Sequence, residues 1–166
     1  MPARAAQICP RTGAYLRPYF ESLLAQAHSD AHLAKMPLTV LWVDVDETQE
    51  GNDTHGLEAM DAALSGLVDE LGAELDGRGP IGRVEGDAFA ASLYAVTPYM
   101  ATRLADGLRR RLEARTFHSG AGDFHLTVSV GVAGLRPGEP YGNLLDAAEA
   151  ACVQAKQAGR NRVVAR

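Results

Sequence analysis

The sequence contains little cysteine and no apolar run long enough to cross a membrane as a helix. Its two cysteines, Cys9 and Cys152, are far apart and lack the spacing of metal-binding pairs. A disulfide framework is therefore not expected, and a reducing compartment is favoured. Residues 1–4 also lack the apolar core of a signal peptide. These features predict a cytoplasmic protein without membrane insertion.

The sequence also lacks an excess of positive charge. It has 16 Lys and Arg residues against 21 Asp and Glu residues, which gives a formal net charge of -5. Proteins that bind nucleic acids gather Lys and Arg on a basic face to neutralise phosphates. The balance argues against a nucleic-acid partner, but it is compatible with a small anionic ligand held at a local site.

Length and composition predict one compact domain. The chain has 166 residues, 46% of them hydrophobic, which is enough to build a sizeable core. We find no internal repeat and no linker long enough to divide the chain. We therefore expect a single domain over residues 1–166, with residues 1–10 as an N-terminal extension.

Helical and strand-like segments alternate along the chain. Apolar spacing, caps and breakers predict helices over 13–32, from about 57 to 71, from Pro98 to about 112, and over 143–158. Thr12 and Thr97 are the expected helix caps. Strands are expected over 38–43, 81–84, 87–94, 124–132 and 162–165, the second and third of them forming a hairpin. The run 38–43 is almost uninterruptedly apolar, as in a strand covered on both faces, and includes Trp42, a core residue in our interpretation.

Carboxylates lie at the ends of two predicted strands. The segment Asp44-Val45-Asp46 comes directly after the strand 38–43, and Asp87 is the first residue of the strand 87–94, after the turn of the hairpin. Mg²⁺ prefers hard oxygen ligands and is often shared with nucleotide phosphates. The pattern therefore predicts a magnesium and nucleotide site, provided that the two strand ends lie side by side. Taken alone, a D-x-D sequence at a strand end is also typical of a solvated loop.

Five short motifs follow one another at coherent spacing. They are RTGAY at 11–15, a D-x-D pattern at 44–46 continued by NDTHG at 52–56 and Asp61, EGDAF at 85–89, TVSVGVA at 127–133 and AKQAGRNR at 155–162. In this order and spacing the chain resembles the GGDEF domain of diguanylate cyclases over nearly its whole length. The element order predicts an α/β (α+β) fold, a ferredoxin-like βαββαβ core widened to a five-stranded, mainly antiparallel sheet flanked by helices, as in nucleotidyl cyclases.

The resemblance implies a metal site on the two strand ends. It places Mg²⁺, or Mn²⁺, on the carboxylates of Asp44 and Asp87 and on the carbonyl of Val45. It also implies that Asp44 and Asp87 are the catalytic carboxylates of a reaction that joins two GTP molecules into cyclic di-GMP.

The resemblance further implies a guanine-nucleotide site. Asn52 and Asp61 match the residues that read the guanine edge, where a carboxylate accepts hydrogen bonds from the base. The loop after Asp46 is expected to offer backbone N–H groups to a phosphate, and charged side chains complete the triphosphate contacts. The nucleotide-binding residues are thus Asn52, Asp61, Gly86, Gln49, Lys156 and Arg160. Without the resemblance, Asp61 reads as an ordinary surface acid and Arg160 as part of a basic tail.

The chain departs from the family pattern at several of these positions. Glu85 replaces the first glycine of the signature, and Ala88 replaces its second carboxylate. Gln49 stands where a phosphate-binding lysine is usual, and Cys9 where an aspartate is usual. Thr48 and Leu57 replace a phenylalanine and a histidine, and the R-x-x-D product-inhibition motif is absent from residues 76–79. These changes predict weaker triphosphate binding and impaired metal-assisted transfer.

Three functions remain open from the sequence. The leading interpretation is a cyclic di-GMP signalling domain that binds GTP with Mg²⁺ but has lost much of its cyclase activity. The alternatives are an active diguanylate cyclase that works as a homodimer, and a protein-interaction module without a ligand. A signalling partner protein is compatible with each. The basic run 109–111 is interpreted as a solvated helix face, with a partner or cyclic-nucleotide contact as the less favoured reading.

Overall fold

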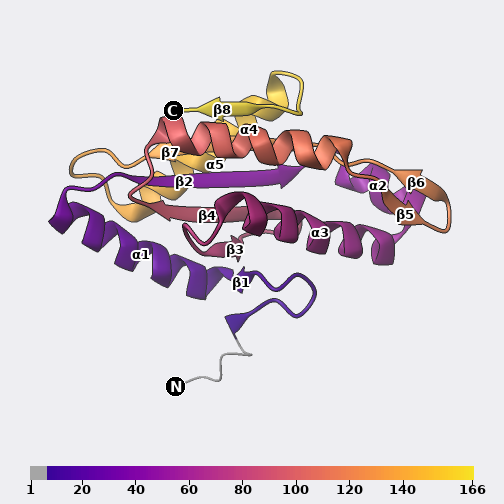
Figure 1. The fold of residues 1–166 in the computed structure, drawn as a ribbon, viewed down its shortest axis with the longest axis horizontal. Coiled ribbons are helices and arrows are strands. Elements are labelled where there is room, and N and C mark those ends of the chain that lie inside the picture. The colour runs from indigo at the N-terminus through magenta and orange to yellow at the C-terminus, as the bar shows by residue number, and fades with distance from the viewer. Residues whose placement is uncertain (1–6) are drawn as a thin grey trace.

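A six-stranded mixed sheet forms the centre of the molecule, in the order β1-β3-β4-β2-β7-β8 (Figure 1). The computed structural model describes residues 7–166, so part of the predicted extension, residues 1–6, lies outside the described residues. The elements are β1 (Tyr15–Leu16), α1 (Arg17–Ala34), β2 (Leu38–Val45), α2 (Thr48–His55), α3 (Leu57–Leu75), β3 (Ile81–Arg83), β4 (Ala88–Tyr94), α4 (Pro98–Ala114), β5 (Phe117–Ser119), β6 (Gly122–Phe124), β7 (Val128–Gly134), α5 (Tyr141–Gln157) and β8 (Val163–Ala165). Among the described residues, no helix is long and apolar enough to span a bilayer.

The strand β2 lies in the middle of the sheet, antiparallel to both β4 and β7. Its residues are buried from Leu38 to Val43, and Trp42 is only 2% exposed. A strand covered on both faces explains why this segment is almost continuously apolar. The predictions of a central strand and of a core tryptophan are both confirmed.

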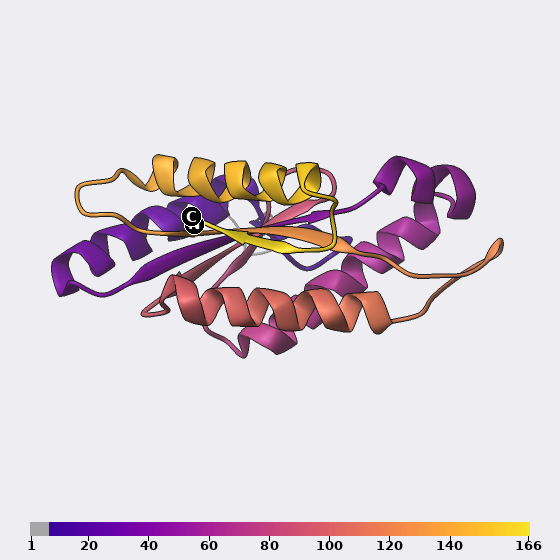
Figure 2. The same cartoon turned by 90° about the horizontal axis from the view of Figure 1, so that it is seen from above.

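Helices cover both faces of the sheet. Figure 2 shows α1 and α5 on one side and α3 and α4 on the other. Side chains of α3 and α4 pack with Leu41, Val43 and Phe89 in one core cluster, whereas side chains of α1 and α5 pack with Val40 and Trp42 in a second cluster. The structure thus confirms the predicted α+β class, with six strands in the main sheet instead of five because the two-residue strand β1 joins its edge.

The predicted start of the first helix is wrong. The helix begins at Arg17, after Leu16 and next to Pro18, and the Thr12 hydroxyl accepts a hydrogen bond from the Ala14 N–H instead of capping it. Residues 13–14 instead lead into β1, which pairs with β3. The Thr97 cap of α4 is confirmed, since its hydroxyl accepts a hydrogen bond from the Met100 N–H.

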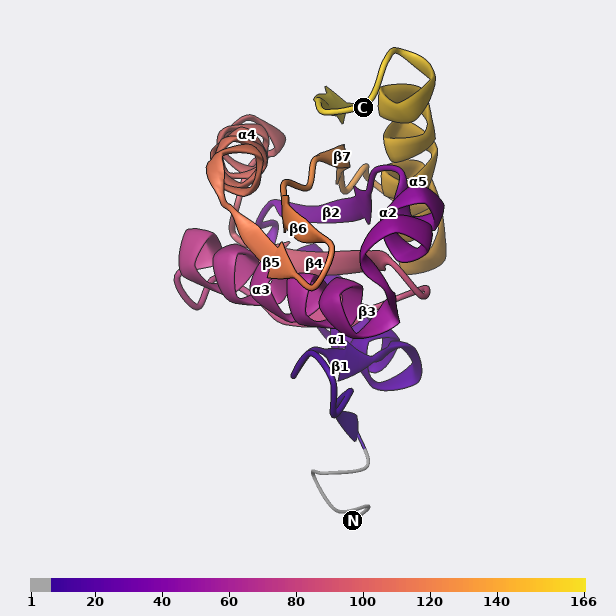
Figure 3. The same ribbon diagram turned by 90° about the vertical axis from the view of Figure 1, so that its right-hand side faces the viewer.

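The segment 48–55 forms a helix that the sequence pattern did not predict. None of the α2 residues is buried, so no apolar periodicity marks it. The helix is attached at its end, where the His55 ring stacks on Phe124 at 4.1 Å and its Nδ1 lies 2.9 Å from Ser119 Oγ. Figure 3 shows α2 beside the β5–β6 hairpin at one end of the molecule.

The predicted strand 124–132 is divided between two sheets. Phe124 ends β6 of the small hairpin, and Val128 begins β7 of the main sheet. The Asp46 N–H donates to the Thr127 carbonyl between these strands. The apolar residues Phe124 and Leu126 remain buried, which is why the sequence reads as one continuous strand.

Candidate functional site

The two carboxylate-bearing strand ends lie side by side, as the sequence predicted. Asp44, near the end of β2, is the register partner of Ala88, the first residue of β4. The Val45 N–H donates to the Asp87 carbonyl at 3.2 Å. Backbone pairing between β2 and β4 therefore fixes the spacing between Asp44 and Asp87.

A lysine from α5 reaches this strand end. The Lys156 Nζ lies 3.2 Å from Asp44 Oδ1, 3.1 Å from the Val45 carbonyl oxygen and 3.6 Å from Asp46 Oδ1. The close packing of α5 against β7 brings the helix to this end of β2. The packing is close because Gly131 of β7 has no side chain, and the Ala148 carbonyl of α5 lies where a Cβ would be. The structure thus joins three of the predicted site residues, Asp44, Val45 and Lys156.

The Asp44 carboxyl group is half-buried, and its ionisation is costly. Burial, with additional repulsion from the charges of Asp87 and Asp46, raises the pKa of Asp44 from 3.8 to about 6, although Lys156 opposes the change. Burial penalises the charged form of a carboxyl group, and neighbouring carboxylates add to that penalty. A cation bound at this edge would relieve the same repulsion.

The second aspartate of the D-x-D pair has a different environment. Asp46 is buried, and its carboxylate accepts hydrogen bonds from Thr127 Oγ1 at 2.7 Å, from Ser129 Oγ at 2.7 Å and from the Asn161 N–H at 3.0 Å. These donors come from the start of β7 and from the turn after α5. Asp46 therefore fixes the turn that carries Arg160, a role that the sequence analysis did not assign.

The Asp87 side chain also has a partner that sequence reasoning missed. Thr48 Oγ1 lies 2.6 Å from Asp87 Oδ2 and 3.3 Å from the Val45 carbonyl oxygen. Thr48 is the first residue of α2. The hydroxyl type at this position is the only sequence signal that could have suggested the contact.

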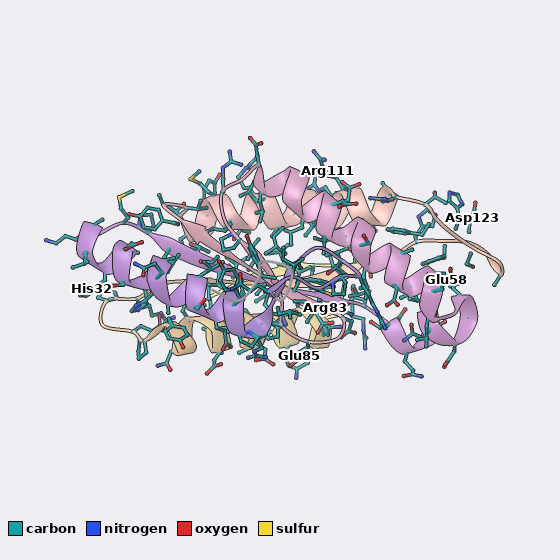
Figure 4. The ribbon with its side chains drawn as sticks, turned by 90° about the horizontal axis from the view of Figure 1, so that it is seen from below. His32, Glu58, Arg83, Glu85, Arg111 and Asp123 are labelled. Carbon is teal, nitrogen blue, oxygen red and sulfur yellow. The ribbon has the colours of Figure 1, made fainter. Side chains whose placement is uncertain are left out.

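The turn between β3 and β4 is held by an arginine. Arg83 donates to the Gly86 carbonyl from Nε at 3.0 Å, and its Nη1 lies 3.3 Å from Cys9 Sγ. Hydrogen bonds from Thr12 and Arg83 outweigh burial and lower the pKa of the Cys9 thiol to about 7. Glu85 and Gly86 are exposed, and Figure 4 shows Glu85 at the outer edge of the molecule.

The remaining predicted nucleotide residues are spread over α2, α3 and the turn after α5. Asn52 is half-buried on α2, and Arg160 is exposed with a positive φ of 64°. Asp61 on α3 forms an exposed ion pair with Arg11, at 3.1 Å. Gln49 contacts Asp53 within α2, at 3.3 Å. The structure therefore does not bring its amide to the carboxylates of Asp44 and Asp87.

The segment after Asp46, where a phosphate-binding loop was predicted, is mostly helical. Only Asp46 and Glu47 separate β2 from α2, and Glu47 has a positive φ of 56°. The first N–H groups of a helix have no partner within the helix and favour an anion. The N–H groups that the sequence analysis placed in a loop therefore belong to the first turn of α2.

The basic run 109–111 is only partly solvated. Arg109 is 16% exposed and donates to Glu113 and to Asn161 Oδ1, both at 3.0 Å, which corrects its interpretation as a solvated residue. The other two arginines are 71% and 55% exposed, as expected. Because the Asn161 N–H binds Asp46, Arg109 connects α4 to the turn beside the site.

Oxygen-bearing groups from two adjacent strand ends are thus linked by shared partners: Lys156 contacts Asp44 Oδ1 and the Val45 carbonyl oxygen, and Thr48 contacts the same carbonyl oxygen and Asp87 Oδ2. The sequence pattern of the family described as "Diguanylate cyclase, GGDEF domain" matches residues 7–162. The chain belongs to the GGDEF family.

Comparisons with individual proteins agree with this assignment. The chain is 33% identical over 158 residues to the Escherichia coli K12 protein named "Probable diguanylate cyclase DgcC", covering 91% of this chain and 41% of that protein. It matches the GGDEF domain of DgcB from Caulobacter crescentus, solved in complex with c-di-GMP, with a TM-score of 0.93, 26% identity, and coverage of 99% and 96% of the two chains. It matches Pseudomonas aeruginosa SiaD, solved with its activator SiaC, with a TM-score of 0.92, 26% identity, and coverage of 98% and 62%. The chain spans less than half the length of the curated relative DgcC.

Within the GGDEF signature, the structure gives the departures a physical meaning. Ala88 lies directly opposite Asp44 and is fully buried at the start of β4. Side chains of directly opposed residues point to the same face of the sheet, about 5 Å apart at Cβ. A carboxylate at position 88 would therefore lie beside Asp44, whereas Ala88 places only a buried methyl group there.

Proposed function

We propose that this GGDEF domain of cyclic di-GMP signalling binds a guanine nucleotide with Mg²⁺ but has lost most or all of its cyclase activity. The observation that carries the proposal is the pairing of Asp44 with Ala88 across β2 and β4. One carboxylate of the signature remains at the rim as Asp87, and its usual neighbour is missing. A domain with this pattern keeps ligands for one metal ion and loses a group that positions a second ion or the attacking hydroxyl.

The donor set fits a hard divalent cation. Asp44, Val45 and Asp87 offer only oxygen atoms, the ligand type that Mg²⁺ and Mn²⁺ accept. The contacts of the Lys156 ammonium with Asp44 Oδ1 and with the Val45 carbonyl oxygen support this proposal, because they already place a positive charge at these oxygens. When bound, the metal ion supplies electrostatic stabilisation of charge on phosphate oxygens.

The residues around this position have distinct roles in the proposal. Lys156 and Arg160 bind the phosphates, together with the N–H groups of the first turn of α2. Asn52 and Asp61 read the guanine edge, and Asp61 must then leave Arg11, an exchange that costs little because the ion pair is exposed. Gly86 leaves space for the nucleotide beside the turn, since no atom lies within 4 Å of the position of a Cβ there.

Two departures support a loss of catalysis more than a loss of binding. Ala88 removes a carboxylate, and Thr48 occupies one oxygen of Asp87, whereas Glu85 adds a charge to the exposed turn and is expected to weaken triphosphate binding. Catalysis depends on the placement of every group at the reacting atoms, whereas binding tolerates the loss of one contact.

The second candidate is an active diguanylate cyclase. The joint placement of Asp44, Val45, Asp87 and Lys156 favours it, because these groups would hold one GTP and its metal ion. In that case two copies of the domain would each bring one nucleotide to a homodimer. A module that only binds a signalling partner protein is less favoured, since it gives no reason for this cluster.

One experiment separates the three functions. GTP and MgCl₂ are titrated into the protein by calorimetry, and the same samples are then analysed for cyclic di-GMP by chromatography. Binding without product is the expected result. Robust product formation would favour the active cyclase, and the absence of binding at millimolar GTP would overturn the proposal.

A further inference from the structure

The Lys156 ammonium occupies the position that a divalent cation would need. Its Nζ lies 3.2 Å from Asp44 Oδ1 and 3.1 Å from the Val45 carbonyl oxygen, which are two of the three oxygens of the proposed metal site. The Lys156 and Asp44 side chains are 27% and 22% exposed, so water screens this position only in part. The ammonium thus neutralises the carboxylate edge in the way that a metal ion would.

Two cations cannot share these oxygens at low cost. Like charges a few Å apart repel strongly where water is partly excluded. A divalent ion that enters must therefore drive Lys156 away from the Val45 carbonyl. An ammonium that leaves the carboxylates needs another anion, and the triphosphate of a nucleotide supplies one next to the metal ion.

We propose that Lys156 is an internal counter-ion that excludes divalent cations from the site until a nucleotide triphosphate binds. This inference rests on the proposed function and adds a condition to it, because the metal ion and the nucleotide then bind as a coupled pair. The coupling is reciprocal: the nucleotide raises the affinity for the metal by the same factor as the metal raises the affinity for the nucleotide.

The structure lets Lys156 move without leaving a buried charge unpaired. Lysine has a flexible stem and three rotatable donors, and Lys156 lies in the last turn of α5. When it departs, Asp46 keeps its donors Thr127, Ser129 and the Asn161 N–H. Of the two aspartates that Lys156 contacts, Asp44 is then the only one that needs the incoming metal ion.

The first test measures Mn²⁺ binding without nucleotide by electron paramagnetic resonance. Lys156→Met should bind Mn²⁺ roughly tenfold more tightly than the unmodified protein, because a full positive charge is removed next to the ligands. Lys35→Met is the matched control, because Lys35 is the only other lysine and is exposed. It directly follows α1 and precedes β2, whereas Asp44 lies near the end of β2. Lys35→Met should bind Mn²⁺ like the unmodified protein.

The same measurement is repeated with a GTP analogue whose α,β-bridging oxygen is replaced by methylene, so that no cyclisation occurs. The analogue should raise Mn²⁺ affinity strongly in the unmodified protein and much less in Lys156→Met. Equal Mn²⁺ affinity of Lys156→Met and the unmodified protein without nucleotide, or no Mn²⁺ binding by either, would overturn the inference.

The second test uses the unmodified chain and does not depend on the folding of a variant. Because the sequence has two lysines, selective labelling with ¹³C and ¹⁵N gives one set of side-chain signals for Lys156 and one for Lys35. Mg²⁺ alone should leave both sets unchanged, and Mg²⁺ with the analogue should shift the Lys156 set only. If the analogue binds calorimetrically but the Lys156 signals do not shift, the counter-ion role and the phosphate contact of Lys156 are both wrong, whereas the proposed binding of a guanine nucleotide stands. If no guanine nucleotide binds, the proposed function fails, while the Mn²⁺ comparison still decides the role of Lys156.

Discussion

Replacing Asp44 by Asn should stabilise the metal-free protein at neutral pH. The folded state raises the pKa of Asp44 from 3.8 to about 6, chiefly by burial, so it disfavours the ionised carboxylate. Asn has nearly the same shape and carries no charge. The predicted gain is the energy that the folded protein now spends to keep this carboxylate ionised.

The size of the effect follows from the pKa difference. At about 1.4 kcal/mol for each pH unit, the difference between 3.8 and about 6 corresponds to at most about 3 kcal/mol. The Asp44 side chain is 22% exposed, and part of this energy is screened by water. We therefore expect Asp44→Asn to raise the free energy of unfolding by about 1–3 kcal/mol at pH 7.5.

The direction of the pKa shift determines how the stability difference between Asp44→Asn and the unmodified protein changes with pH. A folded-state pKa above the unfolded value means that the folded protein binds the proton more tightly. The stabilisation from this proton is complete below pH 3.8 and is lost as the pH rises through about 6. The advantage of Asp44→Asn over the unmodified protein should therefore be largest at pH 7.5 and should mostly disappear by pH 4.5.

Urea unfolding in the presence of EDTA, followed by circular dichroism at both pH values, measures this difference. Asp69→Asn is a suitable control, because Asp69 is an exposed residue of α3. It should change the free energy of unfolding little at either pH. A loss of stability in Asp44→Asn at pH 7.5, or a gain that is the same at both pH values, would refute the reasoning.

Three further substitutions test other parts of the proposal. Asp61→Ala should erase most of the preference for GTP over ATP, since an unpaired base-edge donor costs about 1–3 kcal/mol; calorimetric affinities that keep the preference would contradict this role. Glu85→Gly combined with Ala88→Glu should raise cyclic di-GMP output, because a placed catalytic group is worth roughly 10²–10⁴ in rate; unchanged output in a product assay would show that these positions do not silence the site. Cys9→Asp should stabilise the protein by about 1 kcal/mol through a charge-assisted hydrogen bond with Arg83; urea unfolding that shows a loss would contradict it.

The sequence predicted the parts of the fold that strong local signals specify. The apolar run ending at Val43 predicted the central strand, and the Thr97-Pro98 pair predicted the start of α4. It did not predict α2, because none of that helix is buried and its position depends on tertiary contacts, such as those of Thr48 with Asp87 and of His55 with Phe124. Local propensity carries little information about an element that is held by such contacts.

The same distinction applies to the site. The adjacency of Asp44 and Asp87 arises because Asp44 lies near the end of β2 and Asp87 directly precedes the antiparallel strand β4, and the sequence predicted it correctly. The contact of Thr48 with Asp87 and the exposed position of Gln49 depend on the helical path of α2. These contacts are set by a helix that the sequence pattern does not mark.

The three aspartates of this rim have different roles because their environments differ. Asp46 receives three hydrogen bonds from the protein and is already satisfied, which makes it a structural anchor. Asp44 depends on one movable ammonium, and its ionisation opposes folding. Asp87 shares one oxygen with Thr48, next to a turn held by Arg83. A ligand can compensate a carboxylate whose charge the protein does not fully compensate. We therefore propose Asp44 and Asp87 as the functional pair, with Asp46 as the residue that stabilises the turns around them.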